Sequence, residues 1–271
     1  FEQNYKNWEL IFWDNQSSDS SREIIDSYDD DRIKYFYAQN HTALGDARNL
    51  ALGQASGDWI GFLDVDDLWF PDKLSKQIES ISKANSNVSL CYSRCEFFTD
   101  IIQIDYSVKR ISEIRPSYKK LPQDDLAEEL YFGNIIPFPS LLLKKEALSQ
   151  IGGIPPYRFS PDYYMSLAIS NKFEALAIDE ILCAYRMHNS NLSSQIKEEG
   201  YIEAIQIVSD LAPSDQSNYL IRYNTIRYIF FLLRELRIYD AMKEVMSLGI
   251  IGFNIGLFKF TNHLWRHSRE K

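Results

Sequence analysis

Strand and helix signals alternate along the first hundred residues, and this alternation restricts the possible folds more than any other feature of the sequence. Four β-rich apolar runs, each separated from the next by a segment with helical spacing, lie at 8–13, 32–38, 59–63 and 88–93. A β-α-β-α-β order predicts a parallel sheet with helices on both faces. Ligands of such sheets bind beyond the carboxyl ends of the strands, so we expect the site there.

The remainder of the chain divides into two further regions. The segment 101–195 is mixed, with strand-like runs at 140–143, 174–178 and 181–185 and a further run at 95–98 just before it. The pattern is helical from about 198 to the end. We therefore predict three regions, namely 1–100, 101–195 and 196–271. Because the chain begins at Phe1 and not at Met, we also expect that it lacks the start of a longer protein.

Charge and composition exclude several classes of function. Among 271 residues, 29 are Lys or Arg and 38 are Asp or Glu, a net charge of −9 (29 − 38) that disfavours nucleic acid as the main partner. Three cysteines are too few for a disulfide framework, and we interpret them as buried apolar side chains. No signal peptide is visible, and the longest weakly polar run, 248–260, is shorter than the ~20 residues a membrane span needs. The sequence thus predicts a cytoplasmic protein.

Three carboxylates within four residues, at Asp64, Asp66 and Asp67, follow the third apolar run directly. Such closely spaced like charges are tolerable around a cation or on a turn that faces solvent. Oxygen ligands on a loop suit Mg²⁺ or Mn²⁺, which keep waters and share phosphate oxygens. A solvated turn before the helix that Pro71 opens is an equally good interpretation from the residues alone.

Two more polar residues lie where this edge of the sheet is expected. Asp14 ends the first strand and can accept hydrogen bonds from a ring N–H or from ribose hydroxyls, or it can order the turn that follows. Arg48 lies in the second helix, where it can pair with a phosphate or with Asp46 or another carboxylate at the surface. The residues alone leave both alternatives open.

Taken in order, these motifs resemble those of the family 2 glycosyltransferases, over about residues 1–195. The matching segments, which keep the family's spacing, are 7–19, 47–49, 55–58, 64–71, 133–134, 139–140, 152–153, Asp162 and 185–193. The resemblance implies a GT-A fold, in which a mixed, mostly parallel sheet binds a nucleotide sugar and helices cover both faces. It assigns 1–100 to the nucleotide sugar, 101–195 to the acceptor and 196–271 to a helical C-terminal region.

The resemblance also implies roles for single residues around the donor. Asp14 corresponds to the residue that contacts the nucleotide base, and Arg48 to an arginine near the donor nucleotide. Asp64 and Asp66 match the family's Asp-x-Asp pair, one facing the nucleotide sugar and the other the metal ion, with Asp67 beside them. The later pair, Arg186 and His188, matches a loop that closes toward the diphosphate, and His188 is a further candidate metal ligand with Asp66 and Asp64.

For catalysis, Asp162 matches the residue that takes the proton from the acceptor hydroxyl. Pro161 replaces the acidic residue that commonly precedes this base, so one negative charge of the family's pattern is missing. A divalent ion held by Asp66, Mg²⁺ or Mn²⁺, would stabilise the leaving diphosphate, and a single in-line displacement would invert the anomeric centre. The implied partners are a UDP- or dTDP-sugar and a saccharide or lipid-linked saccharide acceptor, as in bacterial cell-surface polysaccharide or glycolipid synthesis.

Other functional classes remain open at this stage. A sugar nucleotidyltransferase has a similar sheet and metal site but usually a Gly-rich loop after its first strand. A catalytically inactive module that only binds a nucleotide sugar would keep these residues without turnover. A phosphorylation-controlled signalling domain also has acidic residues at strand ends, but in a chain of about half this length.

The last segment, 251–271, is basic in an acidic chain. It has four basic residues and one acidic residue, a net charge of +3 (4 − 1), together with several aromatic side chains. Such a helix can lie on the inner face of an anionic membrane, or its apolar face can pack as core or against a second subunit of a homo-oligomer.

Overall fold

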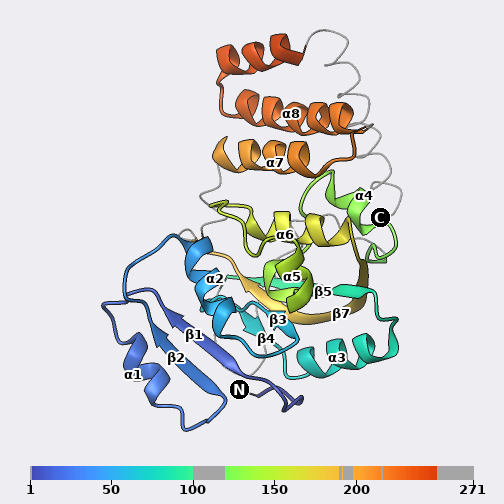
Figure 1. Cartoon of the computed structure of the whole chain (residues 1–271). Coiled ribbons are helices and arrows are strands. Elements are labelled where there is room, and N and C mark those ends of the chain that lie inside the picture. Colours follow the sequence, from blue (N-terminus) through green and yellow to red (C-terminus); the bar gives the residue numbers. More distant parts are fainter. Residues whose placement is uncertain (1, 100–119, 189–190, 192–197, 215, 249–271) are drawn as a thin grey trace.

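The computed structural model describes residues 2–99, 120–188, 191, 198–214 and 216–248. They form a mixed α/β fold in which a five-stranded sheet lies between one helix and a stack of others (Figure 1). A smaller two-stranded sheet lies at the margin of the molecule. The α/β class and the helical C-terminal region, both predicted from the sequence, are confirmed.

The larger sheet has the strand order β3-β6-β5-β7-β4. Its centre is the long parallel pair β5 (Val88–Phe98) and β7 (Glu174–Arg186). The short strands pair antiparallel, with β6 (Leu142–Lys144) between β3 (Trp59–Gly61) and β5, and β4 (Leu68–Trp69) on the outer side of β7. This sheet brings the acidic segment, between β3 and β4, close to the end of β7.

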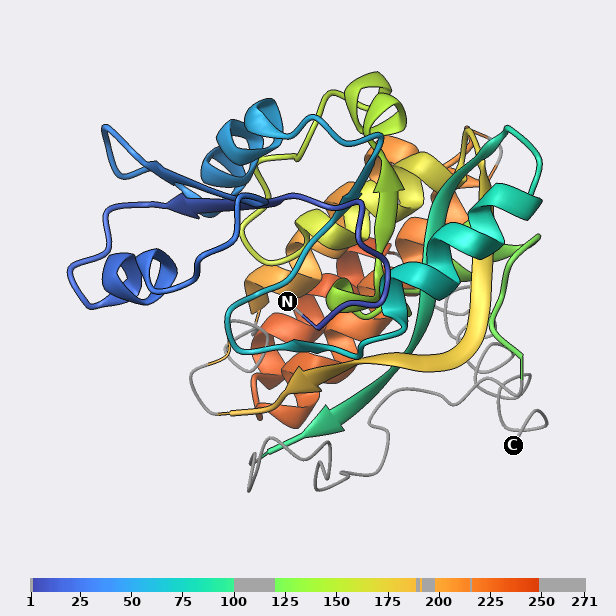
Figure 2. The ribbon, with the colours of Figure 1, turned by 90° about the horizontal axis from the view of Figure 1, so that it is seen from below.

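The first two strands pair only with each other. β1 (Leu10–Asp14) and β2 (Ile33–Tyr37) run parallel in register, and α1 (Ser21–Asp26) connects them at the edge of the molecule (Figure 2). We expected the first four strands in one parallel sheet. Instead β3, which follows α2 (Leu44–Gln54), pairs antiparallel with β6, a strand from the second half of the chain.

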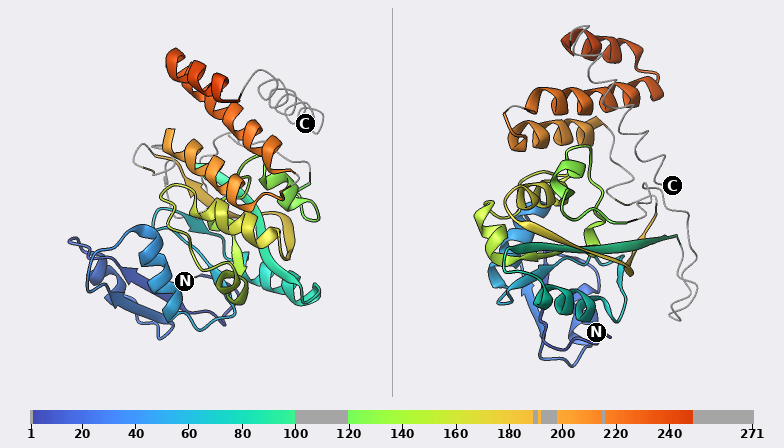
Figure 3. Two further views of the ribbon diagram at one scale, coloured as in Figure 1. Left: turned by 45° about the horizontal axis from the view of Figure 1, so that its top comes forward. Right: turned by 90° about the vertical axis from the view of Figure 1, so that its right-hand side faces the viewer.

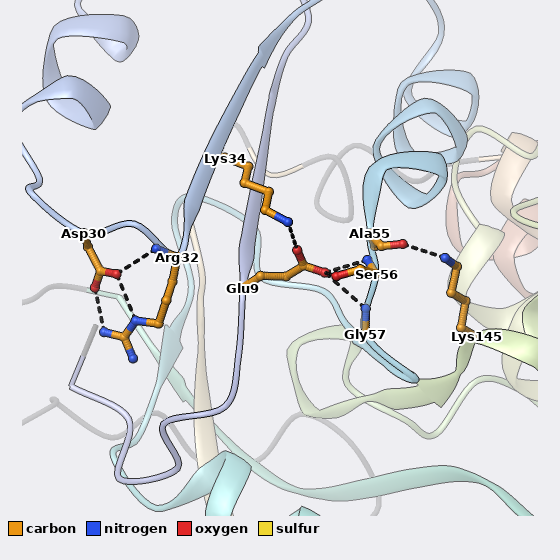
Figure 4. A network of polar contacts seen from close by, with 8 residues as sticks. All are labelled: Glu9, Asp30, Arg32, Lys34, Ala55, Ser56, Gly57 and Lys145. Carbon is orange, nitrogen blue, oxygen red and sulfur yellow. Dashed lines mark hydrogen bonds and ion pairs between the residues drawn. The ribbon is translucent and has the colours of Figure 1, made fainter.

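Polar contacts of Glu9 join the small sheet to the start of β3 (Figure 4). Glu9 Oε2 pairs with Lys34 Nζ at 2.5 Å, and Oε1 accepts hydrogen bonds from Ser56 N and Gly57 N. The hydrogen bond from Lys34 and those from the loop lower the pKa of Glu9 to about 2, despite the opposing effect of burial. Lys145, which directly follows β6, donates from Nζ to Ala55 O at 2.5 Å, so the same loop is also fixed beside the larger sheet.

Helices cover the two faces of the larger sheet unequally. α3 (Lys73–Lys83) packs on one face, and α6 (Pro161–Ser170) packs on the other, with α4 (Leu126–Leu130) and α5 (Lys145–Gln150) beside it (Figure 3). The main hydrophobic core lies between β5 and α6, where Met165, Leu167 and Ile169 are fully buried. This packing fixes the first turn of α6, which carries Asp162.

The C-terminal region stacks on α6 on the side away from the sheet (Figure 3). It consists of α7 (Glu198–Leu211), α8 (Ser217–Arg234) and a helical segment over 238–248. No described helix combines the length and the apolar character needed to cross a membrane. The predicted membrane or packing role of 251–271 falls outside the residues that the structure describes.

The three cysteines form no disulfide and are buried, as interpreted from the sequence. Cys91, Cys95 and Cys183 lie near Lys73, which is itself fully buried. Lys73 Nζ donates to Gln77 Oε1 at 2.6 Å and lies 4.0 Å from the centre of the Trp69 ring. Burial lowers the pKa of Lys73 from 10.5 to about 8.

We expect this buried lysine to make stability depend on pH. Between about pH 8 and 10.5 the unfolded chain binds more protons at Lys73 than the folded chain, so stability rises with pH. Relative to a Lys73→Met variant, the wild-type free energy of unfolding should rise by about 2 kcal/mol between about pH 7.5 and 9.5. Urea denaturation of both proteins across this range measures the difference. A difference that does not change with pH would show that Lys73 keeps its ordinary pKa.

Candidate functional site

Asp14 ends β1 with a buried side chain that is 3% exposed. Its Oδ2 accepts a hydrogen bond from Tyr35 Oη at 2.6 Å, and its Oδ1 accepts one from Ser17 N at 2.6 Å. Burial raises the pKa of Asp14, but these hydrogen bonds outweigh it and hold the pKa below its usual value. The carboxylate therefore stays charged at neutral pH, and it orders the turn after β1, one of the two roles that the sequence left open.

The acidic segment forms a turn between β3 and β4. Asp67 N donates to Asp64 O at 3.1 Å, which closes the turn. The side chains of Asp64 and Asp66 are 45% and 33% exposed, whereas Asp67 is buried. The turn thus presents two carboxylates to solvent and points the third into the protein.

Arg48 and Asp64, both candidates from the sequence, are paired. Arg48 Nη2 donates to Asp64 Oδ1 at 2.9 Å, so α2 is connected to the acidic turn. The guanidinium lies 4.7 Å from the centre of the Phe138 ring, which stacks on Phe62 at 4.9 Å. Phe138 belongs to η1, a short 3-10 helix over Phe138–Ser140. Sequence reasoning gave this aromatic residue no role.

Residues at the end of β7 contact the other two carboxylates of the turn. His188 Nε2 lies 2.9 Å from Asp66 Oδ2, and Arg186 Nε donates to Asp66 O at 3.0 Å. The backbone N of Arg186 donates to Asp67 Oδ1 at 2.9 Å. The fold therefore brings Asp66, Arg186 and His188 together across about 120 residues of sequence.

Asn191 shapes the segment that carries these two residues. It is 6% exposed, its Nδ2 donates to Arg186 O at 2.8 Å, and its Oδ1 accepts from His188 N at 2.6 Å. These bonds fix the backbone between the guanidinium and the imidazole. The sequence motif included Asn191 but did not indicate this function, because an asparagine in a polar loop has many possible partners.

Burial raises the pKa of Asp67 to about 7. Its backbone hydrogen bond from Arg186 opposes the shift, whereas the charges of Asp66 and Asp64 add to it. The other oxygen, Oδ2, is buried with no hydrogen-bond partner among the described residues. Asp67 therefore acts as a structural connection between the turn and β7, not as an exposed ligand.

Asp162 lies in the first turn of α6, next to Asn134. Asn134 Nδ2 donates to Asp162 Oδ2 at 2.7 Å. The loop before α6 also contacts α2, because Asn49 Nδ2 donates to Ile154 O at 2.8 Å and Asn49 Oδ1 accepts from Ile154 N at 2.9 Å. Asn49 is the neighbour of Arg48, so α2 connects the acidic turn with the loop that leads to Asp162.

The oxygen and nitrogen atoms near the acidic turn can be compared with the ligands that a divalent metal ion requires. Asp66 Oδ2 and His188 Nε2 lie 2.9 Å apart. A carboxylate oxygen suits Mg²⁺ or Mn²⁺, whereas an imidazole nitrogen suits a transition-metal ion such as Mn²⁺ better than Mg²⁺. Within the described part of the chain, no group of three or more His, Cys, Asp or Glu side chains could hold a metal ion. The pair therefore fits an ion that takes its remaining ligands from phosphate oxygens and water.

Comparison with known proteins gives two kinds of similarity. Residues 1–133 match the model of the family described as glycosyl transferase family 2. Over 194 residues the chain is 32% identical to the Escherichia coli UDP-Glc:alpha-D-GlcNAc-diphosphoundecaprenol beta-1,3-glucosyltransferase WfgD, covering 71% of this chain and 70% of that protein.

Solved structures share the fold at low sequence identity. S. aureus TarS 1-349 in complex with UDP has a TM-score of 0.59 and 15% identity, over 85% of this chain and 65% of that one. The mannosyltransferase PcManGT from Pyrobaculum calidifontis, in complex with GDP-Man and Mn²⁺, has a TM-score of 0.60 and 16% identity, over 97% of this chain and 73% of that one. Together, the GT-A-like fold, the matched family model and the similarity to WfgD show that the chain belongs to glycosyl transferase family 2.

Proposed function

We propose that this protein transfers a sugar from a nucleoside diphosphate sugar to an acceptor hydroxyl, with inversion at the anomeric carbon. The observation that carries the proposal is the meeting of Asp66 with Arg186 and His188 at the end of β7. A guanidinium, an imidazole and a carboxylate at one place suit a diphosphate bound together with a divalent ion. Family membership supports this interpretation.

The donor nucleotide would lie along the ends of β1 and β3. Asp14 stays ionised and is held by Tyr35, so it can accept hydrogen bonds from a base or a ribose. Arg48 and Asp64 form a partly exposed ion pair, and they would bind phosphate and sugar hydroxyls. The similar structures hold UDP in one case and GDP-Man in the other, and we propose a UDP- or dTDP-sugar here.

For the metal ion, Mg²⁺ or Mn²⁺, we propose Asp66 and His188 as ligands, with Asp64 nearby. When bound, such an ion supplies stabilisation of the negative charge that builds on the leaving diphosphate. Arg186 adds a fixed positive charge at the same place, and its Nε bond to Asp66 O holds the guanidinium against the turn.

Asp162 is the proposed general base. Its carboxylate would take the proton from the acceptor hydroxyl as that oxygen attacks the anomeric carbon, which contributes roughly 10²–10⁴ in rate. Asn134 holds one of its oxygens, Oδ2, through the hydrogen bond of 2.7 Å. One displacement at the anomeric carbon inverts its configuration.

We propose a saccharide or lipid-linked saccharide as acceptor, in bacterial cell-surface polysaccharide or glycolipid synthesis. The name of WfgD states a diphosphoundecaprenol-linked acceptor for that relative. A lipid-linked acceptor would place the reaction at the cytoplasmic face of a membrane. Peripheral membrane contact, or a homo-oligomer formed through the C-terminal helices, remains a prediction.

A screen of nucleotide sugars tests the proposed function. We expect release of UDP or dTDP from one donor in the presence of Mn²⁺ or Mg²⁺, and no release in EDTA. Binding of a nucleoside diphosphate in calorimetry without turnover of any donor would instead identify an inactive binding module. Formation of a nucleotide sugar from a nucleoside triphosphate and a sugar phosphate would identify a nucleotidyltransferase.

A further inference from the structure

Three consecutive backbone carbonyls at the C-terminal end of α4 each accept a hydrogen bond from a distant side chain. Tyr163 Oη donates to Leu130 O at 2.7 Å, Asn224 Nδ2 donates to Tyr131 O at 3.0 Å, and Arg227 Nη1 donates to Phe132 O at 3.0 Å. Two of these donors lie on α8, about 95 residues further along the chain. The turn over residues 130–134 is thus fixed by the C-terminal region.

The two α8 donors are themselves held in place. Asn224 is 2% exposed, and its Nδ2 also donates to Leu220 O at 3.0 Å, within α8. Arg227 Nη1 donates to Asn224 Oδ1 at 3.2 Å as well as to the turn. Because a buried polar group left without a partner costs about 1–3 kcal/mol, this arrangement allows few alternative positions for the turn.

Gly133 lets the chain pass close to α8. Its φ of +143° lies in the region that favours glycine, and a Cβ atom there would meet Arg227 Nη1 at 2.9 Å. The backbone therefore reverses directly beneath the guanidinium. The side chain of the next residue, Asn134, contacts α6 through Asp162.

Asn134 connects this turn to the proposed base. Its Oδ1 accepts a hydrogen bond from Ile136 N at 3.1 Å, which determines the orientation of the side-chain amide. With the oxygen used in this way, Nδ2 is turned toward Asp162 Oδ2 at 2.7 Å. The position of the Asp162 carboxylate thus depends on the backbone of the turn.

We propose that α8, through Asn224 and Arg227, and the turn over 130–134 hold Asn134 as a positioning residue for the Asp162 carboxylate. This inference rests on the proposed function of Asp162 as general base. It gives α8 a part in catalysis that requires no direct contact of Asn224 or Arg227 with the substrate. Since a displacement of about 1 Å can cost about a hundredfold in rate, loosening the turn should lower turnover more than donor binding.

Two substitutions of Asn134 test the direct contact. Asn134→Ala removes the hydrogen bond to Asp162, and we expect kcat to fall about 10- to 100-fold with little change in the donor KM. Asn134→Asp keeps an acceptor for Ile136 N but places a negative charge beside Asp162. We expect the acidic limb of its kcat–pH profile to move to higher pH, because a like charge disfavours the ionised base.

Substitutions in α8 test the remote contacts. Asn224→Ala and Arg227→Met should each lower kcat about 3- to 10-fold without weakening nucleoside diphosphate binding. Ile229→Ala is the matched control, because Ile229 is buried in the separate cluster that joins α8 to Tyr201 of α7. It should lower the unfolding temperature comparably, yet leave kcat within about twofold when assayed well below that temperature.

A double-mutant cycle decides whether α8 acts through Asn134. If it does, Asn134→Ala combined with Asn224→Ala should have about the kcat of Asn134→Ala alone. Additive losses, or a loss of kcat in Ile229→Ala equal to that in Asn224→Ala, would overturn the inference in favour of a general effect of stability.

Failure of this inference can be distinguished from failure of the proposed function. If Asp162→Asn loses turnover but the Asn134 variants do not, the positioning inference alone is wrong. If Asp162→Asn retains turnover, the base assignment is wrong. Carbon-13 NMR titration of the Asp162 carboxyl gives a readout that needs no turnover. Its midpoint should rise in Asn134→Ala and, by less, in Asn224→Ala, and unchanged midpoints in both variants would overturn the inference.

Discussion

Asp162→Asn is expected to lower kcat at least about a hundredfold while leaving the affinity for the nucleoside diphosphate unchanged. An amide cannot take the proton of the acceptor hydroxyl, so the step that needs a base is lost. The fold should be retained, because the side-chain oxygen of asparagine can still accept the hydrogen bond from Asn134 Nδ2. Turnover with saturating donor, together with calorimetry of UDP or dTDP binding, measures the two quantities.

Asp26→Asn is the matched control for this substitution. Asp26 is an exposed residue of α1 that pairs with Arg22. The kcat of the Asp26→Asn variant should therefore stay within about twofold of the wild-type value. Turnover retained in Asp162→Asn would assign the base to another carboxylate. The next residues to substitute are then Glu128 and Glu129 in α4 and Asp124 just before it.

Local patterns were sufficient to predict most of the elements near the site. The apolar runs before Asp14 and Asp64 form strands β1 and β3, and the segment with helical spacing around Arg48 forms α2. For Arg48 the sequence left two alternatives open, a phosphate or a surface carboxylate. The structure pairs Arg48 with a carboxylate, but this is Asp64 and not Asp46. A periodic pattern indicates the type of an element, whereas the partner of a charged side chain depends on the fold.

Strand pairing was harder to predict than strand position. The runs at 88–93 and 95–98 are a single strand, β5, and those at 174–178 and 181–185 are a single strand, β7. Register shifts near Ser93 and Arg94 let β5 continue through the position at which the two predicted runs are separated. The antiparallel pairing of β3 with β6 joins residues more than 80 positions apart, and no local signal specifies such a pair.

Hydrogen bonds to backbone carbonyls are the part of the site that sequence reasoning missed. Every residue carries a carbonyl, so Tyr131 and Phe132 give no sign that they accept bonds from α8. Asn224 within a helix resembles an ordinary surface residue until its burial is known. These bonds run between 101–195 and 196–271, so the predicted boundary between these regions crosses a network of contacts. The division into three regions remains a prediction.

Asp66→Ala is expected to weaken Mn²⁺-dependent binding of UDP or dTDP at least about tenfold, with little effect on stability. The side chain is 33% exposed on a turn, and its pairing with His188, itself 34% exposed, contributes at most about 1 kcal/mol to folding. The bond from Arg186 Nε goes to the backbone oxygen of Asp66, so it survives the substitution. Calorimetry with Mn²⁺ and with EDTA measures the metal-dependent part of the affinity.

Two further substitutions test whether Asp66 is specifically a metal ligand. One is Asp46→Ala, at an exposed position on α2, and the other is His188→Ala, just after β7. Asp46→Ala removes one negative charge near Arg48 without touching the proposed ligands, so its affinity in Mn²⁺ should match that of the wild type. His188→Ala should lose affinity in Mn²⁺ as Asp66→Ala does, because the two side chains lie 2.9 Å apart and would bind one ion. Unchanged affinity in Asp66→Ala would show that the ion is held elsewhere. A loss in Asp66→Ala of equal size in Mn²⁺ and in EDTA would mean that the carboxylate contacts the nucleotide directly, since only a metal ligand loses its effect when the metal is removed.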